Sequence, residues 1–249
     1  MSVSQQVQQW NAQALHKLQA GFPRKALALL NQAVTVVLAL KHSEAKLQLL
    51  SLTYTNLGCF YKKARETDLA LHFFTQAMDC QEQAPHQADA VANTHIGLSS
   101  LFSGEGQHER ALRHALKAVQ VLKKHFVEAP RFVTVLVIAY HNAAVEYESL
   151  GMATEAAELY DTGYRLARER LGNKAALTET MRDKVLGRET RGVPRRWASP
   201  PRVSSQPRGS TRAGTRAGTR FTRLQEPCLV RTRLHTRARE RRNDKQASM

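Results

Sequence analysis

The sequence has few cysteines, no long hydrophobic run and no leader-like N-terminus. Its three cysteines, Cys59, Cys80 and Cys228, are odd in number and form no CxxC pair, which favours a reducing compartment. The longest apolar stretches, residues 34–40 and 133–140, are far shorter than the roughly 18 residues that a membrane-spanning helix needs. The N-terminus is rich in Gln and lacks the apolar segment of a signal peptide. We expect a cytoplasmic protein with no membrane segment, with cytoskeletal association or a nuclear location as alternatives.

Motifs of catalytic sites are missing as well. The sequence contains no phosphate-binding P-loop and no Gly-x-Ser-x-Gly, and Gly104 and Gly106 are not followed by the third glycine of a dinucleotide-binding loop. His108 and His114 are six residues apart, whereas two histidines on a zinc-binding helix are four apart. We therefore predict no catalytic residue, no metal and no cofactor, and we expect the chain not to be an enzyme.

Acidic residues are scarce in one part of the chain only. The net charge of +16 divides unevenly, because residues 1–187 contain 20 Lys+Arg and 17 Asp+Glu, whereas residues 188–249 contain 17 Lys+Arg and 4 Asp+Glu. The second part is also rich in Pro, Gly and Ser and has no apolar periodicity. Because such a stretch cannot bury enough apolar surface to offset its loss of conformational entropy, we predict that residues 188–249 form a disordered Arg-rich tail.

Residues 54–77 contain a pattern that recurs along residues 1–187. Tyr54, Leu57, Gly58 and Tyr61 fall on one face of a helix, and Ala70, Phe74 and Ala77 fall on one face of a second helix. Small residues stand where the two helices would touch. The recurring alanine of the second helix is Ala26, Ala70, Ala111 or Ala156, at spacings of 44, 41 and 45. The residues that define the repeat are Trp10, Tyr54, Gly58, Tyr61, Ala70, Phe74, Gly97, Ala111, Tyr140, Tyr147, Ala156 and Tyr160.

This pattern resembles the tetratricopeptide repeat (TPR), whose plain form has about 34 residues. The longer units here resemble repeats of the kinesin light chain type. The resemblance implies an all-α fold, a right-handed α-solenoid of four TPR-like helix pairs. Leu177, Met181 and Val185 form an apolar stripe that predicts a C-terminal capping helix. We expect a repeat domain over 1–187, with units near 7–43, 51–84, 90–125 and 137–172 and a cap over 174–186.

The resemblance also implies a concave groove lined by the first helix of each pair. The predicted groove residues are Asn11, Thr55, Asn56, Lys62, Lys63, His95, His141 and Asn142. Asn56 and Asn142 occupy equivalent positions, and an amide can pair with the backbone of an extended peptide. The alternative is that these amides bond within the repeat or face water. Lys62 and Lys63 would favour an acidic ligand, although a solvated turn explains them equally well.

A groove that binds chaperone tails is disfavoured. Tetratricopeptide domains of that kind use a clamp of several Lys, Arg and Asn residues, and only Asn56 corresponds to it. Asn11 and Leu15 stand where the first helix would need Lys and Asn, and Thr94 and His95 replace basic groups in the third unit.

The Arg-rich tail leaves several hypotheses open. It could contact RNA or DNA electrostatically, although it has few aromatic residues for base stacking. Residues 237–242 could serve as a nuclear address. Thr211, Thr215 and Thr219 each follow an Arg by three residues, which suits phosphorylation by kinases that prefer upstream Arg. The tail could also be a low-complexity extension without function, or an error in the gene model.

The function that these observations favour is a non-catalytic adaptor or scaffold. Its repeats would bind a peptide or protein segment in the concave groove, with partners that include cytoskeletal or motor-associated proteins. The alternative is a nucleic-acid-associated protein in which residues 188–249 bind RNA or DNA and the repeats recruit partners.

Overall fold

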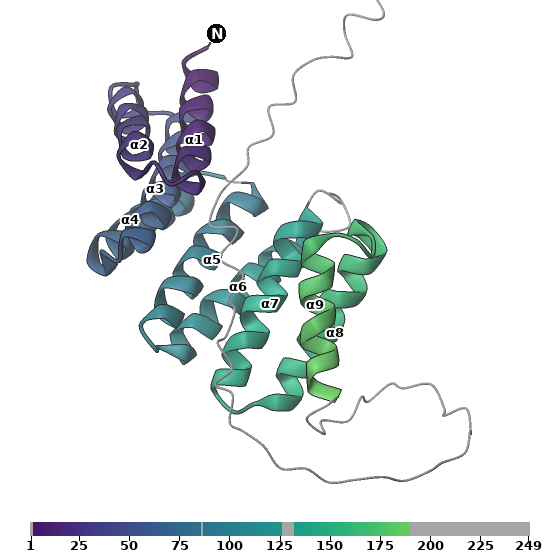
Figure 1. Ribbon diagram of the computed structural model, residues 1–249. Coiled ribbons are helices and arrows are strands. Elements are labelled where there is room, and N and C mark those ends of the chain that lie inside the picture. The colour runs from purple at the N-terminus through teal and green to yellow at the C-terminus, as the bar shows by residue number, and fades with distance from the viewer. Residues whose placement is uncertain (1, 86, 126–131, 190–249) are drawn as a thin grey trace, which may run out of the picture. The chain divides into compact units, whose positions relative to one another are not determined.

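The computed structural model describes residues 2–85, 87–125 and 132–189. The chain divides into two compact units, with the boundary directly after Pro85. The described residues form nine α-helices and no strand, and they contain no helix long and apolar enough to cross a membrane. The predicted all-α architecture of four helix pairs and one final helix is therefore confirmed for this part of the chain (Figure 1).

The first unit contains two helix pairs. Helix α1 (Val3–Gln19) packs on α2 (Pro23–Leu38), and α3 (Glu44–Ala64) packs on α4 (Thr67–Gln83). Helix α3 also contacts both helices of the first pair, so that the two pairs stack. The extra length of the repeat lies partly in α3, which has 21 residues and begins seven residues before the predicted start of the second unit at 51.

The second unit contains two further pairs and a last helix. Helix α5 (Ala88–Gly104) packs on α6 (His108–His125), and α7 (Val133–Ser149) packs on α8 (Ala153–Leu171). Helix α9 (Ala176–Glu189) covers α8 and part of α7. Its residues Met181 and Val185 are buried with Leu177 beside them, and a Cβ on Gly163 of α8 would overlap the Met181 side chain. The predicted apolar stripe of the capping helix is thus the surface that covers the last pair.

A single type of turn joins the two helices of every pair. The chain enters the left-handed region at Gly21, Arg65, Gly106 and Gly151, with φ of 80°, 64°, 73° and 77°. In each turn the next amide donates to the carbonyl five residues back, as Phe22 N does to Lys17 O (2.8 Å) and Met152 N does to Tyr147 O (2.9 Å). This is the Schellman arrangement that ends a helix. Arg65 is the one non-glycine residue with positive φ in the described residues.

Small residues let the helices of a pair approach closely. A Cβ built on Gly58 of α3 would lie 2.7 to 2.9 Å from three ring atoms of Phe74, which is fully buried on α4. Tyr61 does not share this contact; its ring stacks on Phe73, with centroids 5.3 Å apart. The ring that stacks on Tyr61 is therefore that of Phe73, the neighbour of the repeat-defining Phe74, while Phe60 meets Tyr61 edge-on with centroids 5.2 Å apart.

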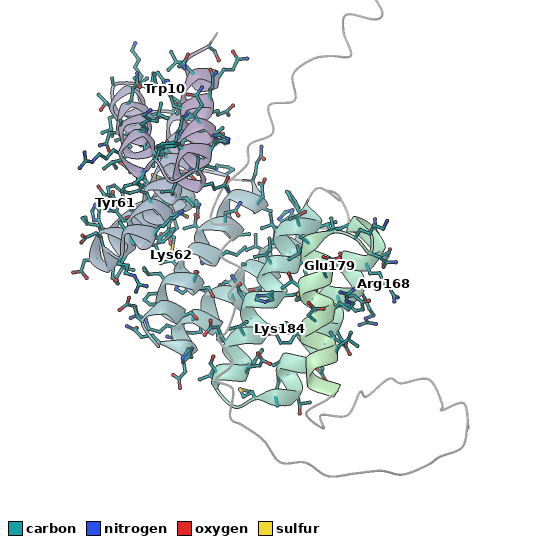
Figure 2. All side chains as sticks on the ribbon, viewed as in Figure 1. Trp10, Tyr61, Lys62, Arg168, Glu179 and Lys184 are labelled. Atoms are coloured by element: carbon teal, nitrogen blue, oxygen red, sulfur yellow. The ribbon has the colours of Figure 1, made fainter. Side chains whose placement is uncertain are left out.

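The repeat-defining residues fall into two classes of burial. Eight are buried within the helix pairs, and the remaining four are half-buried. The buried ones are Gly58, Ala70, Phe74, Gly97, Ala111, Tyr140, Ala156 and Tyr160, and the half-buried ones are Trp10, Tyr54, Tyr61 and Tyr147. Trp10 and Tyr61 are labelled in Figure 2.

Candidate functional site: the first-helix faces

The first helices of successive pairs lie side by side in each unit. Helix α1 contacts α3 in the first unit, and α7 contacts both α5 and α9 in the second. Side chains at the same repeat position on neighbouring first helices are thereby brought to one face. The predicted groove residues all belong to these helices. Each can bind a partner protein only if its side chain is exposed and is not fully occupied by contacts within the repeats.

Asn11 and Asn56 lie inside the interface between α1 and α3. Asn56 Nδ2 donates to Asn11 Oδ1 at 2.8 Å, and Asn11 Nδ2 donates to Val7 O and to Thr53 Oγ1, both at 3.0 Å. Both amides are at least 99% buried, and the neighbouring Thr55 is buried as well. This geometry favours the structural alternative for the amide of Asn56, a hydrogen bond within the stacked repeats.

Lys63 has a local structural partner. Its ammonium donates to the carbonyl of Leu18 at 2.9 Å, at the C-terminal end of α1, where a helix leaves carbonyl groups unpaired. Lys46 does the same for α2, donating to Leu38 O and Leu40 O, each at 2.8 Å. Lys62, labelled in Figure 2, is half-buried on α3. The ammonium group of Lys63 is therefore already hydrogen-bonded to the C-terminal end of α1.

His95 on α5 pairs with His114 on α6. Their Nδ1 atoms are 3.1 Å apart, so one ring donates its proton to the other. Burial, and next to it the proximity of His114 and Lys117, together lower the pKa of His95 to about 4. Burial, Arg110 and Arg113 lower the pKa of His114. Both rings are neutral at pH 7. His95 remains half-exposed.

Sequence spacing predicts no partner for His114, because its partner His95 lies on a different helix. In an antiparallel pair, residues at similar distances from the turn face each other, and His95 and His114 satisfy this condition. His108 also pairs across helices: its Nδ1 is 2.7 Å from Oε2 of Glu146 on α7. Glu146 is 2% exposed, so it does not lie on the solvated helix face on which an acidic residue is expected.

His141 and Asn142 are adjacent on α7 but differ in exposure. The His141 side chain is fully buried, its ring lies edge-on to Tyr160 with centroids 5.8 Å apart, and neither ring nitrogen has a hydrogen-bond partner in the described residues. The pKa of His141 is lowered to about 4, mainly by burial and also by the charge of Lys184, with Asn142 and Glu148 partly opposing the shift. Asn142 is half-exposed, although it occupies the repeat position of the buried Asn56.

Polar groups gather where α7, α8 and α9 meet. Tyr160 donates its hydroxyl to Glu148 Oε2 at 3.0 Å, and Lys184 Nζ lies 5.8 Å from the centre of the Tyr160 ring. Lys184 is labelled on α9 in Figure 2. Ser149, the last residue of α7, is exposed. The second unit therefore presents both a hydrogen-bonding amide and charged groups near its first-helix face.

The described residues offer no constellation for metal chemistry. Nowhere in the described ranges do three His, Cys, Asp or Glu side chains come together, and Cys59 and Cys80 are buried thiols outside any disulfide. Residues 188 and 189 of the predicted tail belong to α9. The predictions about the rest of the tail, namely disorder, nucleic-acid contact and phosphorylation at Thr211, Thr215 and Thr219, lie outside the described residues.

The arrangement of paired helices, glycine-closed turns and close small-residue contacts defines a TPR-type repeat fold. No family model matches the sequence, and no curated protein matches it. Solved structures of TPR-like repeat proteins do match the fold. BtubC (BKLC) from P. vanneervenii is 22% identical, with a TM-score of 0.59 over 82% of this chain and 89% of that chain.

Two further solved structures have the same fold. A putative kinesin light chain with TPR-like repeats from Podosopora anserina is 17% identical, with a TM-score of 0.57 over 76% of this chain and 90% of that chain. A Rap protein complexed with Competence and Sporulation Factor is 16% identical, with a TM-score of 0.55 over 74% of this chain and 51% of that chain. The predicted repeat type is thereby confirmed at the level of the fold.

Proposed function

We propose that the protein is a non-catalytic adaptor that binds a segment of another protein on the first-helix faces of its repeats. The observation that supports this proposal is the contact between α5 and α7, the helices that carry the half-exposed His95 and Asn142. These two side chains occupy the same repeat position on neighbouring helices. An extended segment lying across both helices could hydrogen-bond to each of them in turn.

The second unit is the better candidate for this contact. In the first unit the equivalent amide, Asn56, is bonded to Asn11 and shielded from solvent. In the second unit Asn142 is accessible, and Ser149 and Glu148 extend the polar surface toward the end of α7. We therefore infer that Asn142 contributes to binding, whereas Asn56 contributes to the stacking of the first two pairs.

The similar structures support an interaction role and suggest where to look for partners. The Rap protein of this fold was solved in complex with Competence and Sporulation Factor, and another similar structure is that of a putative kinesin light chain. We propose cytoplasmic partners, with cytoskeletal or motor-associated proteins as the first to test. Cys59 and Cys80 are buried thiols outside any disulfide, which is consistent with a reducing compartment.

Proximity labelling in cells tests the proposal. The full-length chain is compared with the His95→Ala/Asn142→Ala variant and with Asn31→Ala, a matched control whose exposed amide lies on α2, a second helix. We expect the double variant to lose a defined set of labelled proteins that the control retains. If the double variant labels the same proteins as the wild type, the first-helix face of the second unit is not the binding site.

A further inference from the structure

Helix α6 contains the excess positive charge of residues 1–187. It has five basic residues, Arg110, Arg113, Lys117, Lys123 and Lys124, and one acidic residue, Glu109. Subtracting these from the 20 Lys+Arg and 17 Asp+Glu of residues 1–187 leaves 15 basic and 16 acidic residues. The rest of residues 1–187 is therefore nearly neutral, and the net positive charge of this region is carried by α6.

Four of these cations form one stripe along the helix. At about 100° per residue, Arg110, Arg113, Lys117 and Lys124 fall within about 60° of one another around the axis, over a length of about 21 Å. All four side chains are exposed. We call these four residues the basic stripe.

Among the described residues, no acidic side chain forms an ion pair with the basic stripe. Arg110 lies over the ring of Phe102, 4.0 Å from its centre, and donates to Gln107 Oε1 at 2.6 Å, which is a neutral acceptor. Arg113, Lys117 and Lys124 form no ion pair with any described residue. Like charges three and four residues apart on a helix repel one another, so this arrangement slightly destabilises the isolated chain. An anionic partner would remove that repulsion.

We propose that the basic stripe is a docking surface for an acidic segment of a partner protein, in addition to the first-helix face of the proposed function. Carboxylates at every third or fourth position of a helical segment would match the spacing of the stripe, and arginine can hold a carboxylate through two hydrogen bonds. A protein segment fits better than a nucleic acid, because no Phe, Tyr or Trp ring that the structure describes beside the stripe is exposed for a base to stack on. Phe102, the ring beside it, is 4% exposed and lies between Arg110 and His114.

Charge reversal on two matched helices tests the docking surface in the full-length protein. One variant carries Arg113→Glu/Lys117→Glu on α6, and the control carries Arg165→Glu/Arg168→Glu, the same change at exposed positions of α8. Both retain the Arg-rich residues 188–249, so any binding by that part is equal in the two. The probe is a fluorescent synthetic peptide long enough to span the stripe, with glutamate at every third or fourth position, and fluorescence anisotropy measures its affinity.

The α6 variant turns two attractions into two repulsions, and we expect it to weaken peptide binding about tenfold at low ionic strength. The α8 control should change binding less than threefold, and the difference should shrink as salt is added. Equal losses in the two variants, or no loss in either, would overturn the proposal. A fluorescent oligouridylate forms a second arm: if the α6 variant loses the oligonucleotide but not the peptide, the surface binds nucleic acid and the proposed occupant is wrong.

Discussion

Adding one methyl group at Gly58 should destabilise the first unit, because its closest neighbour cannot retreat. A Cβ at this position would lie 2.7 Å from Cδ1, 2.8 Å from Cε1 and 2.9 Å from Cγ of Phe74, whose ring is fully buried between α3 and α4. Overpacking of a core costs about 1–3 kcal/mol. The better helix propensity of alanine returns about 0.5–1 kcal/mol. We therefore expect Gly58→Ala to lower the free energy of unfolding by about 0.5–2 kcal/mol.

The first helix pair supplies a matched rescue. Its residues at the repeat positions of Gly58 and Phe74 are Ala14 and Leu30, and both are buried. The double variant Gly58→Ala/Phe74→Leu reproduces that combination. Phe74→Leu alone should also be destabilising, since it removes ring atoms from a tight core. Because the smaller leucine makes room for the added methyl, the double variant should be less destabilised than the sum of the two single variants.

Trp10 allows the assay to follow the first unit. It lies on α1, packed against the core cluster that includes Val7 and Val37. In a Trp197→Phe background it is the one remaining tryptophan of the chain, so its fluorescence during urea unfolding reports on the first unit. An unchanged or higher midpoint for Gly58→Ala, or strictly additive effects in the double variant, would refute the close-contact explanation.

Three further perturbations test other parts of the structure. Arg65→Gly should stabilise the first unit by about 0.5–1 kcal/mol, because a left-handed conformation is unfavourable for a residue with a Cβ. The reverse change at the equivalent turn, Gly151→Arg, should lower the urea concentration at which the second unit unfolds. The pKa of His141 is lowered to about 4, so the folded state favours the neutral ring. The stability that this preference contributes is fully present above pH 6.5 and is lost as the pH falls toward 4, a loss of roughly 3 kcal/mol in the free energy of unfolding. His141→Phe should therefore flatten the pH dependence of the unfolding midpoint. His108→Ala removes the partner that lies 2.7 Å from the buried Glu146 carboxylate, so it should lower the melting temperature of the second unit. Adding Glu146→Gln to this variant should partly restore the melting temperature.

The helices and their close contacts could be predicted from the sequence, because they depend on local periodicity and on residue size. The helical faces around Gly58 and Ala70 and the apolar stripe of Met181 and Val185 follow from spacings of three and four residues. The turn residues follow in the same way, with Pro23 as the first residue of α2. These features are repeated from pair to pair, so each repeat supports the interpretation of the others.

The side-chain partners could not be predicted, because they depend on how pairs of helices stack. Asn56 and Asn142 share a repeat position, but Asn56 meets Asn11, 45 residues earlier in the chain, whereas Asn142 is half-exposed. Pairwise partners of this kind require the rotation of one helix against the next, which local spacing does not contain. The pair of His95 and His114 was missed for the same reason.

Site-specific photo-crosslinking is the most direct test of the central claim that a partner segment binds the first-helix face of the second unit. A photoreactive phenylalanine replaces Ser149 on α7 in one variant and Arg165 on α8 in another, both exposed positions of the same helix pair. The proposal predicts that irradiation in cells links a defined protein partner to the Ser149 position and not to the Arg165 position, and that His95→Ala/Asn142→Ala abolishes the link. Crosslinks of the same partner at both positions, or at Arg165 alone, would contradict it.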